Sequence, residues 1–213
     1  MDRWEPVLWA LAVAVAMLVA SCTGPKPALV PGEETAKQEG DTVEGETVVL
    51  DFGRPEAHAG WQAINDTVMG GVSHSSAGRG DRGALVFAGT LSLENQGGFA
   101  SVRSPKVDVD LTGSHGVAVR VRGDGKAYKL SAGTDRAFDG IMYQAPFATS
   151  AGEWTEVRIP FGDFTPTYHG RVLTDRPPLD GEAVRSFGFL ISDRQEGPFS
   201  LEVAWIKCYP RQR

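Results

Sequence analysis

The sequence predicts an all-β fold, a β-sandwich or jelly roll built from about nine or ten short strands. The first observation is that apolar residues alternate with a period of two: Val117, Val119 and Val121 alternate with Arg120 and Arg122. The second is that turn residues bound each such run, in a chain with 26 glycines and 13 prolines. No window carries a sustained apolar stripe of 3.6-residue period with caps, so no long helix is expected.

The chain starts with a stretch that is typical of an export signal. Every residue from Val7 to Ala20 is apolar, and Ser21 and Cys22 follow. The run is shorter than the roughly 20 residues that span a bilayer, and it has the length of a signal-peptide core. Val19-Ala20-Ser21-Cys22 resembles a bacterial lipobox, in which the cysteine thiol is acylated and becomes the new N-terminus.

We therefore interpret residues 1–21 as a lipoprotein signal peptide and Cys22 as the lipidation site. An uncleaved N-terminal anchor is the alternative. Both interpretations place the rest of the chain at the cell envelope, outside the cytoplasm, with the lipid anchor as its contact with the membrane. Acyl chains contribute about 0.8 kcal/mol per buried CH₂, so a multiply acylated cysteine would hold firmly.

Residues 22–46 are predicted to form a flexible acidic tether. This stretch has three prolines and six acidic residues, among them Glu46, and only two lysines. Such a composition does not bury enough apolar surface to fold. The folded domain is expected to occupy residues 47–210, where alternating runs recur at 48–52, 117–122, 187–191 and 199–205.

One segment of this domain is predicted to be a β-hairpin, residues 87–103. Leu91 and Leu93 would face one way, and Glu94 before the Gly97-Gly98 turn would share a polar face with Ser101 and Arg103 after it. The alternative is a solvated sheet face with one Glu–Arg cross-strand pair, worth under 1 kcal/mol.

Composition and motifs favour binding over catalysis. The net charge of −6 argues against a nucleic-acid partner, because no basic stripe is present to displace counterions from phosphates. Four scattered histidines and two cysteines predict no metal site and no bound cofactor.

If Cys22 is acylated, Cys208 has no partner for a disulfide and is expected to be a small buried apolar residue. The glycine motif at 78–83 precedes a strand and opens no helix, so it is a loop.

Two longer stretches carry a family resemblance. Residues 61–73 read W-x-x-x-N-D-x-V-M-G-G-V-S, and residues 87–103 read F-x-G-x-L-S-L-E-N-x-G-G-F-A-S-V-R. Together with 123–130, 138–144, 152–154, 160–164 and 188–193, they resemble the complex I intermediate-associated protein 30 family. The resemblance implies a galactose-binding-like β-sandwich. It also implies a chaperone-like assembly factor without catalysis, whose mitochondrial members act on respiratory complex I.

Polar side chains of these stretches are the predicted site residues, namely Asn65, Asp66, Ser73, Glu94, Asn95, Arg103, Tyr143 and Gln144. The alternative for Asn65, Asp66 and Asn95 is that they only fix turns.

Three functions remain open. A protein partner at the envelope is the first. A glycan is the second, stacked on aromatic side chains such as Trp61, Tyr128, Tyr143 and Trp154, each of which could instead be core. A glycosidase-like enzyme, using two carboxylates among Asp66, Glu94, Asp135 and Asp139, is a distant third.

Overall fold

A computed structural model describes residues 45–134 and 140–211. The chain divides into two units, residues 1–40 and 41–213, and all described residues belong to the second. The signal peptide, Cys22 and most of the predicted tether therefore lie outside the described residues. Within the described ranges, no helix has the length and apolar character needed to cross a bilayer.

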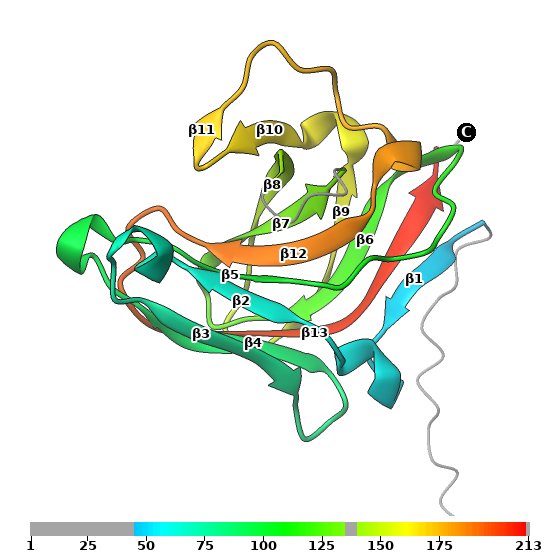
Figure 1. Cartoon of the computed structure of the whole chain (residues 1–213). Helices are drawn as coiled ribbons and strands as arrows, with labels where there is room; N and C mark the ends of the chain where they lie inside the picture. The colour runs from blue at the N-terminus through cyan, green and yellow to red at the C-terminus, as the bar shows by residue number, and fades with distance from the viewer. Residues whose placement is uncertain (1–44, 135–139, 212–213) are drawn as a thin grey trace, which may run out of the picture. The chain divides into compact units, whose positions relative to one another are not determined.

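The described residues form two antiparallel sheets packed as a sandwich, which confirms the predicted fold class (Figure 1). The six-stranded sheet contains β3 (His74–Arg79), β4 (Leu85–Leu91), β13 (Gly197–Pro210), β6 (Ser114–Arg122) and β9 (Trp154–Pro160) in that order, with β1 (Thr47–Asp51) also paired to β13. The seven-stranded sheet has the order β11 (Arg171–Val172), β10 (Thr165–Tyr168), β8 (Met142–Ala148), β7 (Ala127–Gly133), β12 (Ser186–Ile191), β5 (Ala100–Arg103) and β2 (Gln62–Asn65).

Short 3₁₀ turns join these strands. They are η1 (Pro55–His58), η2 (Asp66–Met69), η3 (Glu94–Gln96), η4 (Phe161–Asp163) and η5 (Gly181–Ala183).

Alternation places the core between the sheets, as the sequence predicts. On β12, Phe187, Phe189 and Ile191 are fully buried, and Gly188 and Leu190 therefore face the opposite side. The long strand β13 changes face along its length. Phe199, Leu201 and Val203 point inward, but the register shifts between Val203 and Trp205, so that Ile206 and Cys208 are buried instead. The alternating run expected over residues 199–205 is therefore interrupted before Trp205. Cys208 is a buried free cysteine, as expected.

The predicted hairpin at 87–103 is also wrong. Strand β4 pairs with β3 and β13, whereas β5 pairs with β12 and β2 in the other sheet. The connection crosses from one sheet to the other through η3, where Asn95 and Gln96 adopt left-handed φ values of 53° and 62°. Local turn signals fix the position of a turn but not the sheet that the next strand joins.

The folded unit includes the last residue assigned to the tether. The side chain of Glu46 is only 1% exposed, and its carboxylate forms ion pairs with Arg158 and Lys207. These two cations come from β9 and β13, so Glu46 fastens the start of β1 to the six-stranded sheet.

Candidate functional site

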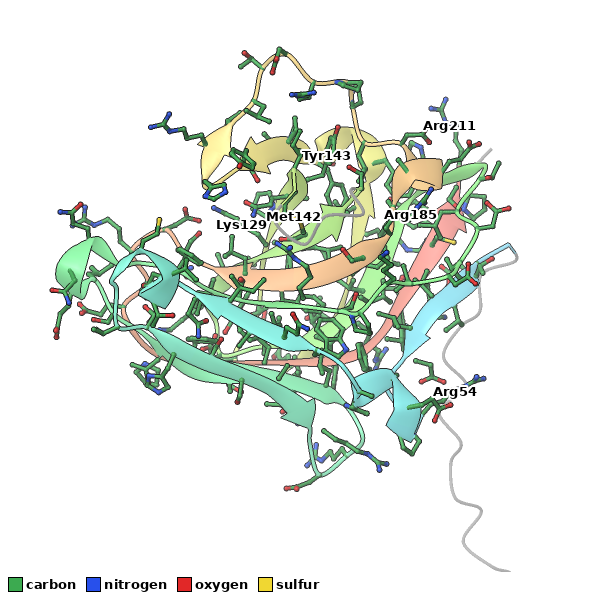
Figure 2. The ribbon with its side chains drawn as sticks, in the orientation of Figure 1. Arg54, Lys129, Met142, Tyr143, Arg185 and Arg211 are labelled. Atoms are coloured by element: carbon green, nitrogen blue, oxygen red, sulfur yellow. The ribbon has the colours of Figure 1, made fainter. Side chains whose placement is uncertain are left out.

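A groove with a volume of about 390 Å³ lies on the outer face of the seven-stranded sheet. Its floor comes from outward-facing residues of β5, β12, β7 and β8, whose neighbours in sequence point into the core. Figure 2 shows Lys129 and Met142, two of the lining residues, between β12 and the β10–β11 hairpin.

The strand register aligns a row of polar residues across this floor. Directly opposed residues on neighbouring strands are, in order, Arg103, Gly188, Ser131, Gln144 and Thr165. A second row places Ser101 opposite Leu190 and Leu190 opposite Lys129. Because neighbouring strands lie about 4.8 Å apart, each row runs perpendicular to the strands at that spacing.

Gly188 leaves the centre of the first row without a side chain. A Cβ at this position would lie 2.6 Å from the backbone oxygen of Val102 on the adjacent strand, a distance that real Cβ atoms do not adopt. The close approach of β5 and β12 therefore requires glycine here. The consequence for the site is that a ligand can reach the backbone between Arg103 and Ser131.

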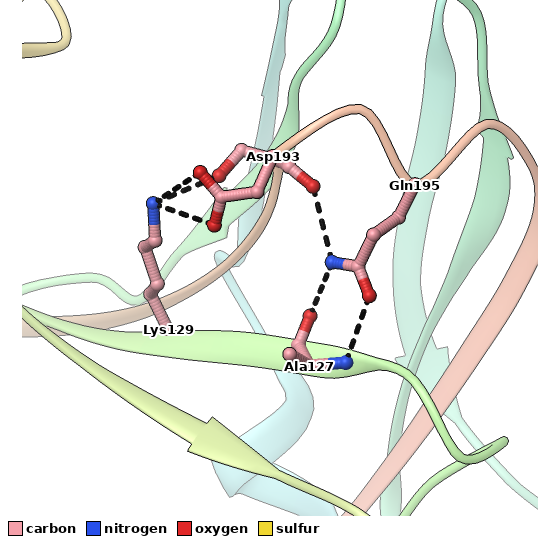
Figure 3. Close-up of polar contacts among 5 residues, drawn as sticks. Ala127, Lys129, Asp193 and Gln195 are labelled. Carbon is pink, nitrogen blue, oxygen red and sulfur yellow. Dashed lines mark hydrogen bonds and ion pairs between the residues drawn. The ribbon is translucent and has the colours of Figure 1, made fainter.

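One wall of the groove is a rigid polar turn after β12. The ammonium group of Lys129 donates to Ser192 Oγ at 3.0 Å and lies 2.9 Å from Asp193 Oδ2 (Figure 3). Asp193 and Arg194 both have left-handed φ values, 60° and 61°. The side chain of Gln195 offsets the strain of this conformation. Its amide accepts from Ala127 N at 2.9 Å and donates to Ala127 O at 2.7 Å.

An apolar rim lies at the same end of the sheet as this turn, because β2 and β12 end opposite the same residue of β5, and the rim is formed by Val68 and Met69 of η2. Both side chains line the groove, and they remain 72% and 62% exposed. The turn ends at Gly70, whose φ of 93° is a left-handed conformation that favours glycine. Exposed apolar side chains held at the edge of a groove are typical of interaction sites.

A buried carboxylate, that of Asp66, fixes this rim. Asp66 Oδ1 accepts from the backbone N–H of Ser73 at 2.9 Å, and Oδ2 accepts from Ser73 Oγ at 2.5 Å. Oδ2 also accepts from the backbone N–H groups of Gly98 at 2.7 Å and Phe99 at 3.3 Å. We call these four residues the Asp66 cluster. It joins the two signature stretches through residues that are 32 positions apart in the chain, Asp66 and Gly98.

The Asp66 cluster is both charged and tightly packed. Burial would raise the pKa of Asp66, but the hydrogen bonds from Ser73, Gly98 and Phe99 outweigh it and hold the pKa below its usual value. A Cβ at Gly71 would lie 2.5 Å from this carboxylate, and one at Gly97 would lie 2.6 Å from Oδ2. The carboxylate thus accounts for one glycine in each signature stretch, Gly71 and Gly97.

The structure brings two of the eight predicted site residues to the groove, Arg103 and Gln144. Asp66 and Ser73 are fully buried in the Asp66 cluster. Asn65 lies beside this cluster, where its Oδ1 accepts from Ser75 Oγ at 2.6 Å.

The other three lie away from the floor. Tyr143 points into the core and donates to the backbone oxygen of Pro177 at 3.1 Å. Glu94 and Asn95 lie on the exposed η3 turn. Asp66, Ser73 and Tyr143 therefore have contacts that account for their presence without a ligand.

Sequence reasoning missed the apolar residues of the site. Val68 and Met69 sit in a turn-rich stretch where only polar residues were considered. Leu190 could have been found from the inward set Phe187 and Phe189, because alternation places it on the opposite face.

The aromatic side chains considered for sugar stacking do not line the groove. Tyr128 is 1% exposed, and its hydroxyl donates to Asp124 at 3.0 Å. Trp61 packs against the core, and Trp154 lies under the guanidinium of Arg122 at 5.1 Å. Among the described lining residues, Phe99 is the single phenylalanine, tyrosine or tryptophan.

The described part of the groove lining holds one imidazole, that of His169. No group of three or more His, Cys, Asp or Glu is placed to hold a metal ion within the described ranges. Asp193 is the one carboxylate among the described lining residues, and it is paired with Lys129. Asp135 and Asp139 lie outside the described residues.

The two antiparallel sheets and the groove on the outer face define a galactose-binding-like β-sandwich. A family 11 carbohydrate-binding module from Clostridium thermocellum, solved with a β-1,3-1,4-mixed-linked tetrasaccharide, is similar with a TM-score of 0.57. The likeness covers 79% of this chain and 98% of that one, at 17% sequence identity. The agarase AgWH50C is similar with a TM-score of 0.53 at 13% identity, over 79% of this chain and 25% of its own. At such identities the likeness establishes the fold alone.

The sequence identifies the family. Residues 50–203 match the family model of Complex I intermediate-associated protein 30, and the chain belongs to this family. The mitochondrial complex I intermediate-associated protein 30 of Mus musculus is 32% identical over 183 residues, which cover 76% of this chain and 56% of that protein. Its Drosophila melanogaster counterpart is 27% identical over 185 residues, covering 76% and 62%. The chain thus spans a little over half the length of these relatives.

Proposed function

We propose that this chain is a non-catalytic binding protein of the assembly-factor type, and that its groove holds part of a protein partner. The observation that carries the proposal is the apolar rim. The side chains of Val68 and Met69 are exposed to solvent. The Asp66 cluster, with its buried charge and close-packed glycines, nevertheless holds their turn in one conformation. A pre-organised apolar edge loses little entropy when a partner covers it, so it favours binding.

The relatives support the assembly part of this proposal. They are named for association with an intermediate of complex I. By analogy, the partner of this chain would be a subunit of that complex, or of another membrane assembly that is not yet complete. Such a subunit would present apolar surface that its final neighbours later bury.

The proposed location is the outer surface of a membrane, with acyl chains on Cys22. The apolar run from Val7 to Ala20 and the small residues before Cys22 support it. A partner would then be an exported protein or the extracytoplasmic part of a membrane protein. The acidic residues after Cys22 would serve as the tether between lipid and domain.

The test is site-specific photo-crosslinking in cells that express the full-length chain. A photoreactive residue replaces Val68 at the rim and, as a matched control, Val48, which is 50% exposed on β1 of the other sheet. We expect discrete protein adducts from position 68 that are absent from position 48, and mass spectrometry then identifies the partner. Adducts that are missing, or identical at the two positions, would reject the proposal.

A glycan ligand is the second candidate, and the polar row favours it. Ser131 and Gln144 line the groove and align a hydroxyl and an amide group at the spacing of neighbouring strands, which suits a hydroxyl-rich chain. Titration with the mixed-linked tetrasaccharide, followed by NMR, tests this candidate. Shifts confined to the row would support a glycan, and their absence at millimolar ligand would reject it.

A further inference from the structure

The groove crosses most of the seven-stranded sheet, and its length bounds the size of the segment that can fill it. It is lined by residues from Ile64 on β2 to Thr167 on β10, which are six neighbouring strands of the sheet. At about 4.8 Å between strands, the groove extends about 24 Å. An extended polypeptide rises about 3.3 Å per residue, so roughly seven residues fit.

The apolar part of the lining is aliphatic and sulfur-containing. The chain has four methionines, and the two within the described residues, Met69 and Met142, both line the groove. They come from η2 and β8 at separate places along it, and Leu190 of β12 lies on the floor between these elements. Methionine side chains are unbranched and polarizable, so they adapt to apolar groups of different shape.

The polar part of the lining suits a backbone that has no partner strand. The groove runs perpendicular to the strands, so a segment inside it forms no ladder with them, and side chains must satisfy its N–H and C=O groups. Ser131 and Gln144 lie in the row beneath such a segment, and both can donate and accept. The lining lacks the exposed aromatic faces on which sugar rings stack, because Phe99 is its single phenylalanine, tyrosine or tryptophan among the described residues.

From these observations we infer that the groove binds an extended, unpaired polypeptide segment with apolar side chains, and that Met69 and Met142 are its side-chain anchors. The inference rests on the proposed function, and it adds the conformation and chemistry of the bound part. Recognition through adaptable thioethers and backbone contacts tolerates many sequences. The ligand is therefore a class of incompletely folded segments and not one folded surface.

The test measures fluorescence anisotropy of labelled nonapeptides with the full-length protein in lipid nanodiscs. One peptide has leucine at alternate positions among serine and aspartate, and the second has serine in place of each leucine. The variants are M69Q/M142Q, which makes both anchors polar, and M69L/M142L, which keeps them apolar. V48Q is the matched control for an exposed apolar residue outside the groove. Thermal unfolding checks that every variant is folded.

We expect the leucine peptide to bind the wild-type protein and the serine peptide to bind at least about tenfold more weakly. M69Q/M142Q should bind the leucine peptide about tenfold more weakly than the wild-type protein does. The affinities of M69L/M142L and V48Q for this peptide should lie within about twofold of wild type. Equal binding of the two peptides, or equal affinities of M69Q/M142Q and V48Q, would overturn the inference. If position 68 crosslinks to a partner and no peptide binds, the proposed function stands and the extended-segment inference falls. If position 68 gives no specific crosslink and no peptide binds, both the proposed function and the extended-segment inference are rejected.

Discussion

Replacing Asp66 with asparagine tests the cluster that fixes the apolar rim. The carboxylate accepts four hydrogen bonds, one on Oδ1 and three on Oδ2. Asparagine keeps one acceptor oxygen, and if that oxygen replaces Oδ2, the new NH₂ group faces the backbone N–H of Ser73. At least one charge-assisted bond is lost, and one buried donor is left without an acceptor. Each of these effects costs about 1–3 kcal/mol, and they overlap because both concern the same bond, so we expect Asp66→Asn to lower the free energy of unfolding by about 2–4 kcal/mol.

Urea unfolding followed by tryptophan fluorescence measures this loss. For an m-value of about 2 kcal/mol per molar urea, the midpoint should fall by about 1–2 M. The matched control is Asp110→Asn, because Asp110 is an exposed carboxylate that accepts one backbone hydrogen bond from Thr112 at 2.9 Å. This control should change stability by less than about 0.5 kcal/mol. An Asp66→Asn protein as stable as the control would refute the reasoning.

The pH dependence of the same variant has a definite sign. The pKa of Asp66 is lower in the folded protein than its usual value of about 3.9, because the hydrogen bonds outweigh burial. The unfolded chain therefore binds the proton more tightly, and the stabilisation is complete above the unfolded pKa. It is lost as the pH falls through the folded pKa. The stability difference between wild type and Asp66→Asn should be constant above about pH 5 and should narrow below about pH 4; a difference that widens in acid contradicts the assignment.

Three further changes have defined outcomes. Cys22→Ala should move the protein from the membrane fraction to the soluble fraction and abolish labelling by radioactive palmitate; retention with label would contradict lipidation. Glu46→Gln removes a buried charge that holds Arg158, and should lower the free energy of unfolding by about 2–3 kcal/mol in urea. Arg122 binds Glu202 through two nitrogens on the outer face of the six-stranded sheet. Arg122→Lys should therefore lower the free energy of unfolding by about 1 kcal/mol, and an unchanged value would mean that solvent fully screens the pair.

The fold could be predicted from the sequence because each strand buries one face. The alternation of Phe187, Phe189 and Ile191 gives both the strand and its inward side. Sheet membership is a different matter, since it depends on contacts between distant segments. The link from β4 to β5 resembles a hairpin in sequence, but β5 pairs with β2 and β12, and the attachment of Gly98 and Phe99 to Asp66 lies at the start of that pairing.

The site was harder to predict, because polarity does not distinguish an exposed ligand-binding group from a buried structural one. Asp66 was predicted as a site residue on its polarity, yet it is fully buried and its four bonds are internal. Met69 is apolar and is not among the predicted site residues, yet it is 62% exposed and lines the groove. For both residues the deciding fact is the register of neighbouring segments, which the sequence does not state.

The predictions for Asp66 and Met69 fail for the same physical reason, and this reason also concerns the cellular location in which the protein can act. The polar residues of the first signature stretch form the support, and the apolar residues between them form the surface that the support displays. A groove that binds through methionines and backbone contacts needs no cofactor or compartment-specific chemistry. It needs only a supply of segments that are not yet folded, and such segments occur wherever proteins enter or cross a membrane. If Cys22 is acylated as proposed, export would change the partner of the domain and leave its mode of recognition unchanged. The groove variants should then alter peptide binding equally whether or not the lipid anchor is present.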